Sequence, residues 1–159
     1  QLKLGDNIAL ISDAGTPGIS DPAYKLTREA IANQIKIESI PGPSAILASL
    51  VSSGLPTDRF LFEGFLPPKK GRKKRLENLK NETATIVFYE SPMKLLKTLS
   101  DIFNIFGDSP MVIARELTKM YEEIYRGDVS ECIAHFSKKK PKGEFVILLG
   151  KKDPNVYFK

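Results

Sequence analysis

A segment with few bulky side chains lies near the start of the chain, SDAGTPGISDP at residues 12–22. Gly15 and Gly18 allow the main chain to approach a ligand closely, because glycine has no Cβ. Asp13 and Thr16 carry oxygens that can hydrogen-bond to hydroxyl or ammonium groups. The segment is therefore suited to holding a small polar molecule against the backbone. The same composition is also typical of an ordinary tight turn, so the pattern by itself leaves both interpretations open.

A second segment of the same style, IPGPSA at residues 40–45, follows the next apolar run along the chain. In an open α/β sheet, ligands bind beyond the carboxyl ends of the strands. If both apolar runs are neighbouring strands, the two turns border one cleft. This pairing strengthens the binding interpretation over that of two unrelated turns.

Polar residues at two further strand ends are the other candidates for chemistry. Glu90 follows a predicted strand, and the sequence RELTK at residues 115–119 is followed closely by Glu122. Structural ion pairs are an equally good explanation for these residues. A phosphate-binding loop and a dinucleotide-binding glycine motif are both absent from the sequence. The single histidine, His135, is three residues from Cys132 and cannot complete a zinc site or a nucleophile–histidine triad, so no metal is expected.

Positive charge is concentrated in two short runs, within a chain whose formal net charge is +5. The sequence KKKPK at residues 138–142 is one of them, and the other is KKGRKKR at residues 69–75. Such runs suit a polyanion, because each neutralised phosphate releases a counterion. A solvated surface that keeps the protein in solution is the alternative. Two runs in one short chain favour RNA, for which the predicted binding residues are Lys69, Lys70, Lys73, Lys74, Arg72 and Arg75.

Composition limits the class of protein. A chain of 159 residues with 42% hydrophobic and 27% charged residues is typical of a globular protein. No apolar run is long enough to span a bilayer, so no membrane partner is expected. A single cysteine fits a reducing compartment, which predicts a cytoplasmic location. Because the chain begins with Gln1 and reaches a strand almost at once, we expect that an N-terminal portion is missing.

Alternating apolar runs and helical patterns predict the elements that position these residues. Strands are expected at residues 7–13 and 36–42. A helix capped by Asp21 follows the first strand, and a helix over residues 45–54 that ends at Gly54 follows the second. The second half predicts strands at 60–67, 83–91, 111–118, 122–128 and 143–151, with helices in the basic stretch, after Pro92 and near 130–137. The predicted fold class is α/β, with a partial parallel α/β domain over residues 1–57 and an α+β domain with a mixed or antiparallel sheet over residues 58–159.

Six segments occur in an order that carries a family resemblance. They are SDAGTPGISDPAYKL, IPGPSAILASLVSSGLPTDRF, FEGFLP, IVFYESP, IARELTKMYEEIYRG and KGEFVILLG. Together they resemble the tetrapyrrole-methylase-like class of S-adenosylmethionine-dependent methyltransferases. Within this class they are most similar to the bacterial members that methylate the 2′-hydroxyl of a cytidine in small-subunit ribosomal RNA. The resemblance runs from about Ile8 to Gly150.

The resemblance implies two α/β domains with S-adenosylmethionine bound in the cleft between them, and a homodimer. It also implies small-subunit ribosomal RNA, free or in the assembled small subunit, as the substrate. From its charge, we expect the basic run at 69–75 to hold the RNA backbone. The general base is left undecided among Asp13, Glu90, Lys119 and Glu122. The resemblance assigns cofactor contacts to Ala14, Gly15, Thr16, Ile19, Ser44, Ala45, Glu90 and Leu117.

Members of this class begin with a further strand and a Gly-Pro-rich loop, which this sequence lacks. We therefore expect the isolated chain to bind the cofactor weakly and to have little or no activity. Two alternatives remain: a methyltransferase acting on a porphyrin-like tetrapyrrole, and a non-catalytic RNA-binding module. The basic runs argue against the first, and retention of the predicted cofactor turns argues against the second.

Overall fold

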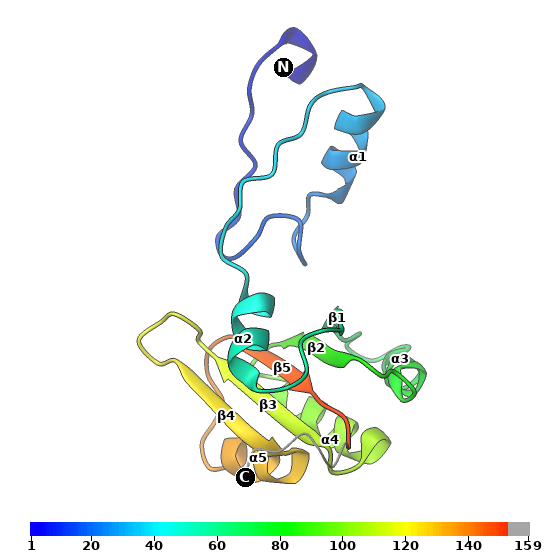
Figure 1. The fold of residues 1–159 in the computed structure, drawn as a ribbon, viewed down its shortest axis with the longest axis vertical. Helices are drawn as coiled ribbons and strands as arrows, with labels where there is room; N and C mark the ends of the chain where they lie inside the picture. The colour runs from blue at the N-terminus through cyan, green and yellow to red at the C-terminus, as the bar shows by residue number, and fades with distance from the viewer. Residues whose placement is uncertain (153–159) are drawn as a thin grey trace. The chain divides into compact units, whose positions relative to one another are not determined.

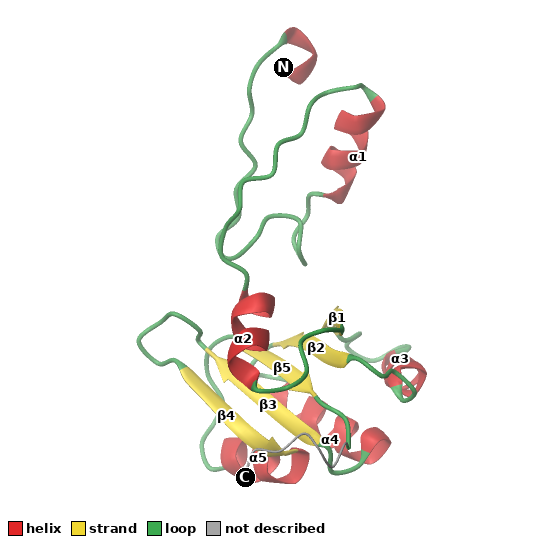
Figure 2. Cartoon of the chain, in the orientation of Figure 1, coloured by secondary structure: helices red, strands yellow, loops and turns green. Residues whose placement is uncertain are grey.

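The computed structural model describes residues 1–152, which form two compact units (Figures 1 and 2). The first unit comprises Gln1–Ser44, and the second begins at Ala45. The predicted boundary at residue 57 differs from this division by the position of helix α2 (Ala45–Ser53), which packs against strand β5 of the second unit. The assignment of residues 1–57 to one cofactor-binding domain stays a prediction.

The first unit consists mainly of irregular chain, with a short 3₁₀ helix η1 (Leu2–Leu4) and helix α1 (Tyr24–Ala32). The strands predicted at residues 7–13 and 36–42 are wrong, because neither segment is a strand in this unit. A strand needs a hydrogen-bonded neighbour, and no strand among residues 1–152 pairs with either segment. Their apolar side chains are accordingly exposed, with Ile11 at 85% and Ile40 at 82%.

Helix α1 begins later than predicted. Its N-cap residue is Ala23 rather than Asp21, and Pro22 precedes the helix instead of lying in its first turn. The chain passes through a left-handed conformation at Ser20, with φ of +60°, so helical geometry starts only after Pro22. The buried apolar residues of this unit are Ala23 and Ala30.

The second unit is built on a five-stranded sheet with the strand order β1-β2-β5-β3-β4. Strands β1 and β2 pair in parallel, and every other neighbouring pair is antiparallel. The predicted α/β class with a mixed sheet is therefore confirmed. The strands are β1 (Phe60–Phe65), β2 (Thr85–Glu90), β3 (Pro110–Arg115), β4 (Glu123–Asp128) and β5 (Phe145–Leu149).

Helices cover both faces of this sheet (Figure 2). Alternate residues of a strand point to opposite faces, so Phe88 and Ile147 join one buried cluster while Val87 and Leu148 join the other. The first cluster includes residues of α3 (Arg72–Leu79), α4 (Leu95–Phe106) and α5 (Val129–Ser137), and the second includes residues of α2.

Helix α2 is fixed to the sheet at its C-terminal end. Gly54 ends the helix in a left-handed conformation with φ of +83°, as predicted from the sequence. The guanidinium of Arg126 on β4 donates hydrogen bonds to the carbonyl oxygens of Ser52 and Ser53. Arg126 thereby satisfies carbonyls that have no partner within the helix.

No helix among residues 1–152 is both long enough and apolar enough to cross a membrane.

Candidate functional site

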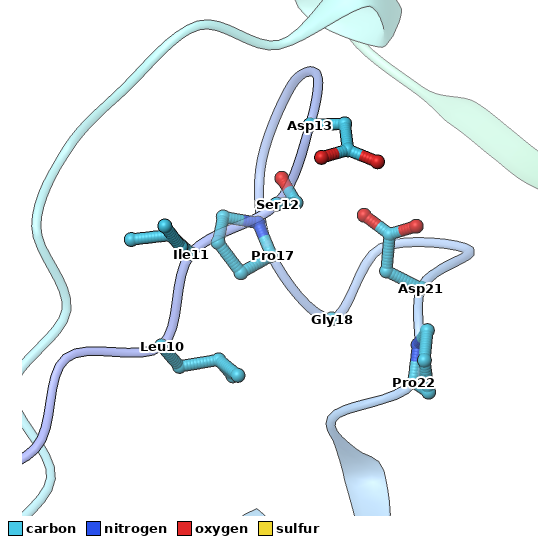
Figure 3. Close-up of a pocket in the computed structure, with 8 residues that line it drawn as sticks. All are labelled: Leu10, Ile11, Ser12, Asp13, Pro17, Gly18, Asp21 and Pro22. Atoms are coloured by element: carbon cyan, nitrogen blue, oxygen red, sulfur yellow. The ribbon is translucent and has the colours of Figure 1, made fainter.

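Residues 10–22 line a small pocket (Figure 3). The pocket has a volume of about 220 Å³. The carboxylates of Asp13 and Asp21 lie on one side of it and point toward each other across the turn. The remaining lining residues are Leu10, Ile11, Ser12, Pro17, Gly18 and Pro22.

The two side-chain-poor turns of the first unit are joined by a hydrogen bond, although the neighbouring strands from which a shared cleft was predicted are absent from this unit. The hydroxyl of Thr16 donates a hydrogen bond to the carbonyl oxygen of Pro43 at 2.9 Å. Within the first turn, Ser12 Oγ donates to the carbonyl oxygens of Ala14 and Gly15 at 3.1 and 3.3 Å. These bonds hold the main chain of the first turn in one shape. The pocket itself is lined by the first turn and by Leu10 and Ile11 before it, and by no residue of the second turn.

Both glycines of the first turn adopt conformations that favour glycine. Gly15 has φ of +70° and Gly18 has φ of +84°. A Cβ at Gly15 would meet no atom within 4 Å, so open space borders the main chain there. Small-molecule sites usually enclose about 300–1,000 Å³, so this pocket fits a part of a nucleoside-sized ligand rather than all of it. Ala14 and Ile19 are exposed on the same turn, and Ser44 and Ala45 are half-buried.

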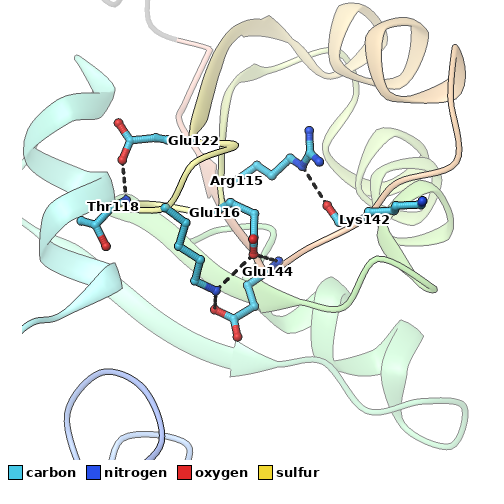
Figure 4. Close-up of polar contacts among 7 residues, drawn as sticks. Arg115, Glu116, Thr118, Glu122, Lys142 and Glu144 are labelled. Carbon is cyan, nitrogen blue, oxygen red and sulfur yellow. Dashed lines mark hydrogen bonds and ion pairs between the residues drawn. The ribbon is translucent and has the colours of Figure 1, made fainter.

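The RELTK segment forms a polar cluster at the end of β3 (Figure 4). Glu116 Oε1 accepts hydrogen bonds from the Lys119 ammonium at 3.2 Å and from the Glu144 amide at 2.8 Å. Lys119 also donates to Glu144 Oε2 at 2.9 Å. The Glu144 amide and the Lys119 ammonium lower the pKa of Glu116, and the carboxylates of Glu144 and Glu116 raise the pKa of Lys119. Lys119 is therefore held in its protonated form.

The backbone of this cluster is strained. Glu116 and Thr118 have φ of +49° and +66°, which residues with a Cβ rarely adopt. Such strain persists where surrounding contacts hold it, and it is frequent at functional sites. The Thr118 amide donates to Glu122 Oε2, and Figure 4 shows Glu122 pointing away from the Glu116 carboxylate. A Cβ at Gly143 would lie 2.5 Å from Glu116 Cγ, so Gly143 makes room for this side chain.

Glu90 is buried at the end of β2, and its two carboxylate oxygens form hydrogen bonds with residues outside the RELTK cluster. One of its carboxylate oxygens accepts from the Ser91 amide at 2.8 Å, and the other accepts from the Thr98 hydroxyl at 2.5 Å. Thr98 Oγ1 in turn accepts from Arg72 Nη2 at 2.7 Å, and Arg72 Nε donates to Asp101 Oδ2 at 2.7 Å. A continuous polar chain therefore runs from Glu90 to Asp101 through the interior.

The six basic residues of the 69–75 run have different environments. Arg72 is only 5% exposed, so it cannot contact a phosphate without leaving its partners. Arg75 makes a two-pronged ion pair with Glu63, in which Nη2 lies 2.8 Å from Oε2. Lys73 lies 3.7 Å from Glu77. The remaining three, Lys69, Lys70 and Lys74, are exposed and form no ion pair within residues 1–152.

The histidine and the cysteine have structural environments. His135 stacks on Tyr125 with ring centroids 4.0 Å apart, and its Nε2 lies 2.6 Å from Glu123 Oε1. Burial raises the pKa of the Cys132 thiol to about 12. In the described part of the chain, no group of three or more histidine, cysteine or acidic residues could hold a metal ion.

Sequence reasoning missed the partners of the predicted residues. Glu116, Gly143 and Glu144 meet only because β3 and β5 pair, and no local pattern indicates such a contact. The burial of Arg72 did have a signal, because Arg72, Leu76 and Leu79 share a helical spacing that puts them on one face.

Leu117 is half-buried and packs on the cluster that contains Val87 and Leu148. The cofactor-binding and catalytic roles assigned to these residues stay predictions.

Comparisons with known proteins give a consistent result. The chain is 50% identical over 152 residues to ribosomal RNA small subunit methyltransferase I of Thermotoga maritima, and the match covers 96% of this chain and 68% of that protein. It is 46% identical over 156 residues to the protein of the same name from Synechocystis, and this match covers 97% of this chain and 56% of that protein. The chain thus spans between about half and two thirds of the length of relatives of this name.

The fold also has solved counterparts. The structure of uroporphyrin-III C-methyl transferase from Thermus thermophilus, complexed with S-adenyl homocysteine, matches with a TM-score of 0.58 and 18% identity. The match covers 86% of this chain and 62% of that one, and at this identity it shows the fold alone. The family model for tetrapyrrole (corrin/porphyrin) methylases matches residues 1–133. This match and the identity to the Thermotoga protein show that the chain belongs to the tetrapyrrole methylase family.

Proposed function

We propose that this chain belongs to an enzyme that methylates the 2′-hydroxyl of a cytidine in small-subunit ribosomal RNA, with S-adenosylmethionine as the methyl donor. The relatives that resemble it over 96–97% of its length carry the name of a ribosomal RNA small subunit methyltransferase. The observation that carries the proposal is the pair of turns joined by the bond from Thr16 to Pro43, where Gly15 leaves the main chain open to a ligand.

The first turn would hold the cofactor through its main chain. S-adenosylmethionine supplies a methyl group on a positively charged sulfur, and no metal is needed for its transfer. The residues that would contact it in the first unit are Ala14, Gly15, Thr16, Ile19 and Ser44. The carboxylates of Asp13 and Asp21 stand at the pocket, where negative charge favours a cationic ligand. Ala45, Glu90 and Leu117 are proposed contacts from the second unit.

Among the predicted general bases, Asp13 is the one that the geometry supports best. Lys119 is held protonated by two carboxylates, and both oxygens of Glu90 already accept hydrogen bonds. Asp13 is exposed at the pocket and has no hydrogen bond or ion pair with any residue of 1–152. Asp13 would accept the proton of the ribose hydroxyl while the oxygen forms its bond to the methyl carbon; the bond from that carbon to the sulfur would break, and the sulfur would leave as a neutral thioether. Glu122 remains the second candidate, because only one of its oxygens is engaged.

The remaining partners follow from the same proposal. The exposed lysines of the 69–75 run would contact RNA phosphates, in free ribosomal RNA or in the assembled small subunit. A homodimer and a cytoplasmic location are part of the proposal. A porphyrin-like substrate is less well supported, because the matching uroporphyrin-III C-methyl transferase is 18% identical to this chain, whereas two relatives named for ribosomal RNA are 50% and 46% identical.

A methyl-transfer assay tests the proposal. The protein at its full natural length is incubated with S-adenosylmethionine labelled in the methyl group and with unmethylated small ribosomal subunits or a porphyrinoid. We expect label in the ribosomal RNA, at one position where the modified ribose makes the backbone resistant to alkaline cleavage. Label in the porphyrinoid alone would support the tetrapyrrole alternative. RNA binding without any transfer would support the non-catalytic module.

A further inference from the structure

A groove between helices α3 and α4 lies outside the turns that carry the proposed cofactor site. Its volume is about 460 Å³, roughly twice that of the pocket in the first unit. Residues 97, 101, 104 and 105 form its α4 wall, and their spacing places them on one face of that helix. Residues 69, 72, 73 and 76 form the opposite wall.

The floor of the groove is formed by a buried arginine that is held by several hydrogen bonds. Arg72 lies there with only 5% exposure, and its Nε donates to Asp101 Oδ2 at 2.7 Å across the two helices. The same guanidinium donates to Thr98 at 2.7 Å and to the carbonyl oxygen of Pro67 at 3.4 Å. The half-buried side chain of Ile105 adds an aliphatic surface beside this pair, and Leu76 is fully buried beneath it. Arg72 therefore shapes the groove from below rather than reaching out of it.

The rim of the groove is positively charged and available. Four basic residues and one acidic residue line the groove, which gives a formal charge of +3. Within residues 1–152, Lys69 and Lys97 form no ion pair, and Lys73 has only Glu77 at 3.7 Å. Asn104 adds an exposed amide that can donate and accept hydrogen bonds.

We propose that this groove binds the backbone of the substrate RNA, with Lys69, Lys73 and Lys97 contacting phosphates and Asn104 contacting a ribose hydroxyl. The inference rests on the proposed function, and it extends the RNA contact from the basic run onto α4. Ammonium groups on both walls suit consecutive phosphates of one strand, and the aliphatic side chain of Ile105 suits the ribose between them. A free phosphate ion would leave most of the groove unfilled.

The test uses Lys97, which lies outside the basic run, and Lys80 as the matched control. Both are exposed lysines, and Lys80 follows α3 without lining the groove. Binding of in vitro transcribed small-subunit ribosomal RNA to the full-length protein is measured from 50 to 200 mM salt. We expect Lys97→Ala to weaken binding about threefold and to reduce the salt slope by about 0.7, which is one phosphate contact. Lys80→Ala should change neither quantity by a comparable amount.

A crosslinking experiment provides a second readout that does not depend on affinity. Cys132 is fully buried, so a cysteine introduced at the surface is the only exposed thiol among residues 1–152. We expect Asn104→Cys to react with RNA that carries a thiol-reactive group on a backbone phosphorothioate. Ser100→Cys, on the same helix but outside the groove, should react much less.

Equal effects of Lys97→Ala and Lys80→Ala, or equal crosslinking at 104 and 100, would overturn the groove as an RNA site and leave the proposed function standing. If the unaltered full-length protein bound neither the transcribed ribosomal RNA nor assembled small ribosomal subunits, both the groove and the proposed function would be wrong.

Discussion

The two units of this chain differ in how much apolar surface they bury and in whether they carry the candidate cofactor turns. Of the buried apolar residues, only Ala23 and Ala30 belong to residues 1–44, whereas the second unit buries both faces of a five-stranded sheet. The first unit nevertheless carries the two side-chain-poor turns and the pocket with two free-standing carboxylates. Binding loops are commonly drawn from the less stable part of a protein, because they must adapt to a ligand. The comparison therefore predicts that stability resides in the second unit and cofactor affinity in the first.

The largest expected effect is a difference between the two units in how a substitution changes the free energy of unfolding. Phe88→Ala removes a fully buried ring from the sheet and should lower the free energy of unfolding by about 3–5 kcal/mol. Ile11→Ala removes an 85% exposed side chain of the first unit and should change it by less than about 0.5 kcal/mol. Urea unfolding followed by far-ultraviolet circular dichroism measures both, and comparable losses would break the comparison.

A second prediction sharpens the account of the second unit's interior. Thr98→Val keeps the shape of the side chain but leaves an oxygen of Glu90 and an N–H of Arg72 without their partner. Buried polar groups without a partner cost about 1–3 kcal/mol, so the free energy of unfolding should fall by that amount. Ser100→Ala on the exposed face of α4 is the control and should be nearly neutral. A neutral Thr98→Val would mean that the chain from Glu90 to Asp101 adds nothing to stability.

The third prediction concerns the first unit and the cofactor. Gly15→Val places a β-branched side chain at φ of +70° and in the open space beside the turn. We expect at least a tenfold loss of S-adenosylmethionine affinity, or about 1.4 kcal/mol, in calorimetry on the full-length protein. Gly5→Val is the control, since Gly5 also has positive φ but lies outside the pocket. Unchanged cofactor affinity in Gly15→Val would remove the turn from the site.

The same division explains which parts of the structure could be predicted from the sequence. Val87 and Phe88 point to opposite buried faces, and a run of apolar residues is what a strand covered on both sides requires. The apolar run at residues 7–13 has the same character but pairs with no strand of residues 1–152, so composition alone gave a wrong element there. A strand is defined by its neighbours, which a local pattern does not contain.

The candidate site shows the same limit. The two turns were predictable, because glycine and proline mark turns, but the parallel strands that were expected to bring them together are absent from residues 1–44. The partners of Lys119 were not, since Glu116 is near in sequence but Glu144 reaches it only through the pairing of β3 with β5. The prediction that Arg72 contacts RNA depends on its charge alone, whereas its helical spacing with Leu76 and Leu79 places it on the buried face of α3.

The smallest expected effect concerns pH, and it tests whether the carboxylate of Glu116 holds the strained RELTK cluster of the second unit in place. The Glu144 amide and the Lys119 ammonium lower the pKa of Glu116 in the folded protein. A carboxyl group with a lowered pKa stabilises the folded state above its unfolded pKa, and this contribution is lost as the pH falls through the folded value. The cluster should therefore stay closed at neutral pH and loosen in acid, below the ordinary glutamate pKa of 4.5.

The measurement is exchange of the Glu144 amide hydrogen, followed by nuclear magnetic resonance and corrected for the intrinsic exchange rate. Protection of this hydrogen should decline in the same acid range. Glu116→Gln should remove the decline because glutamine does not titrate. Glu77→Gln, at an exposed position of α3, should leave the decline unchanged. Protection that is independent of pH in the unaltered protein would mean that the strained backbone holds this loop without the carboxylate.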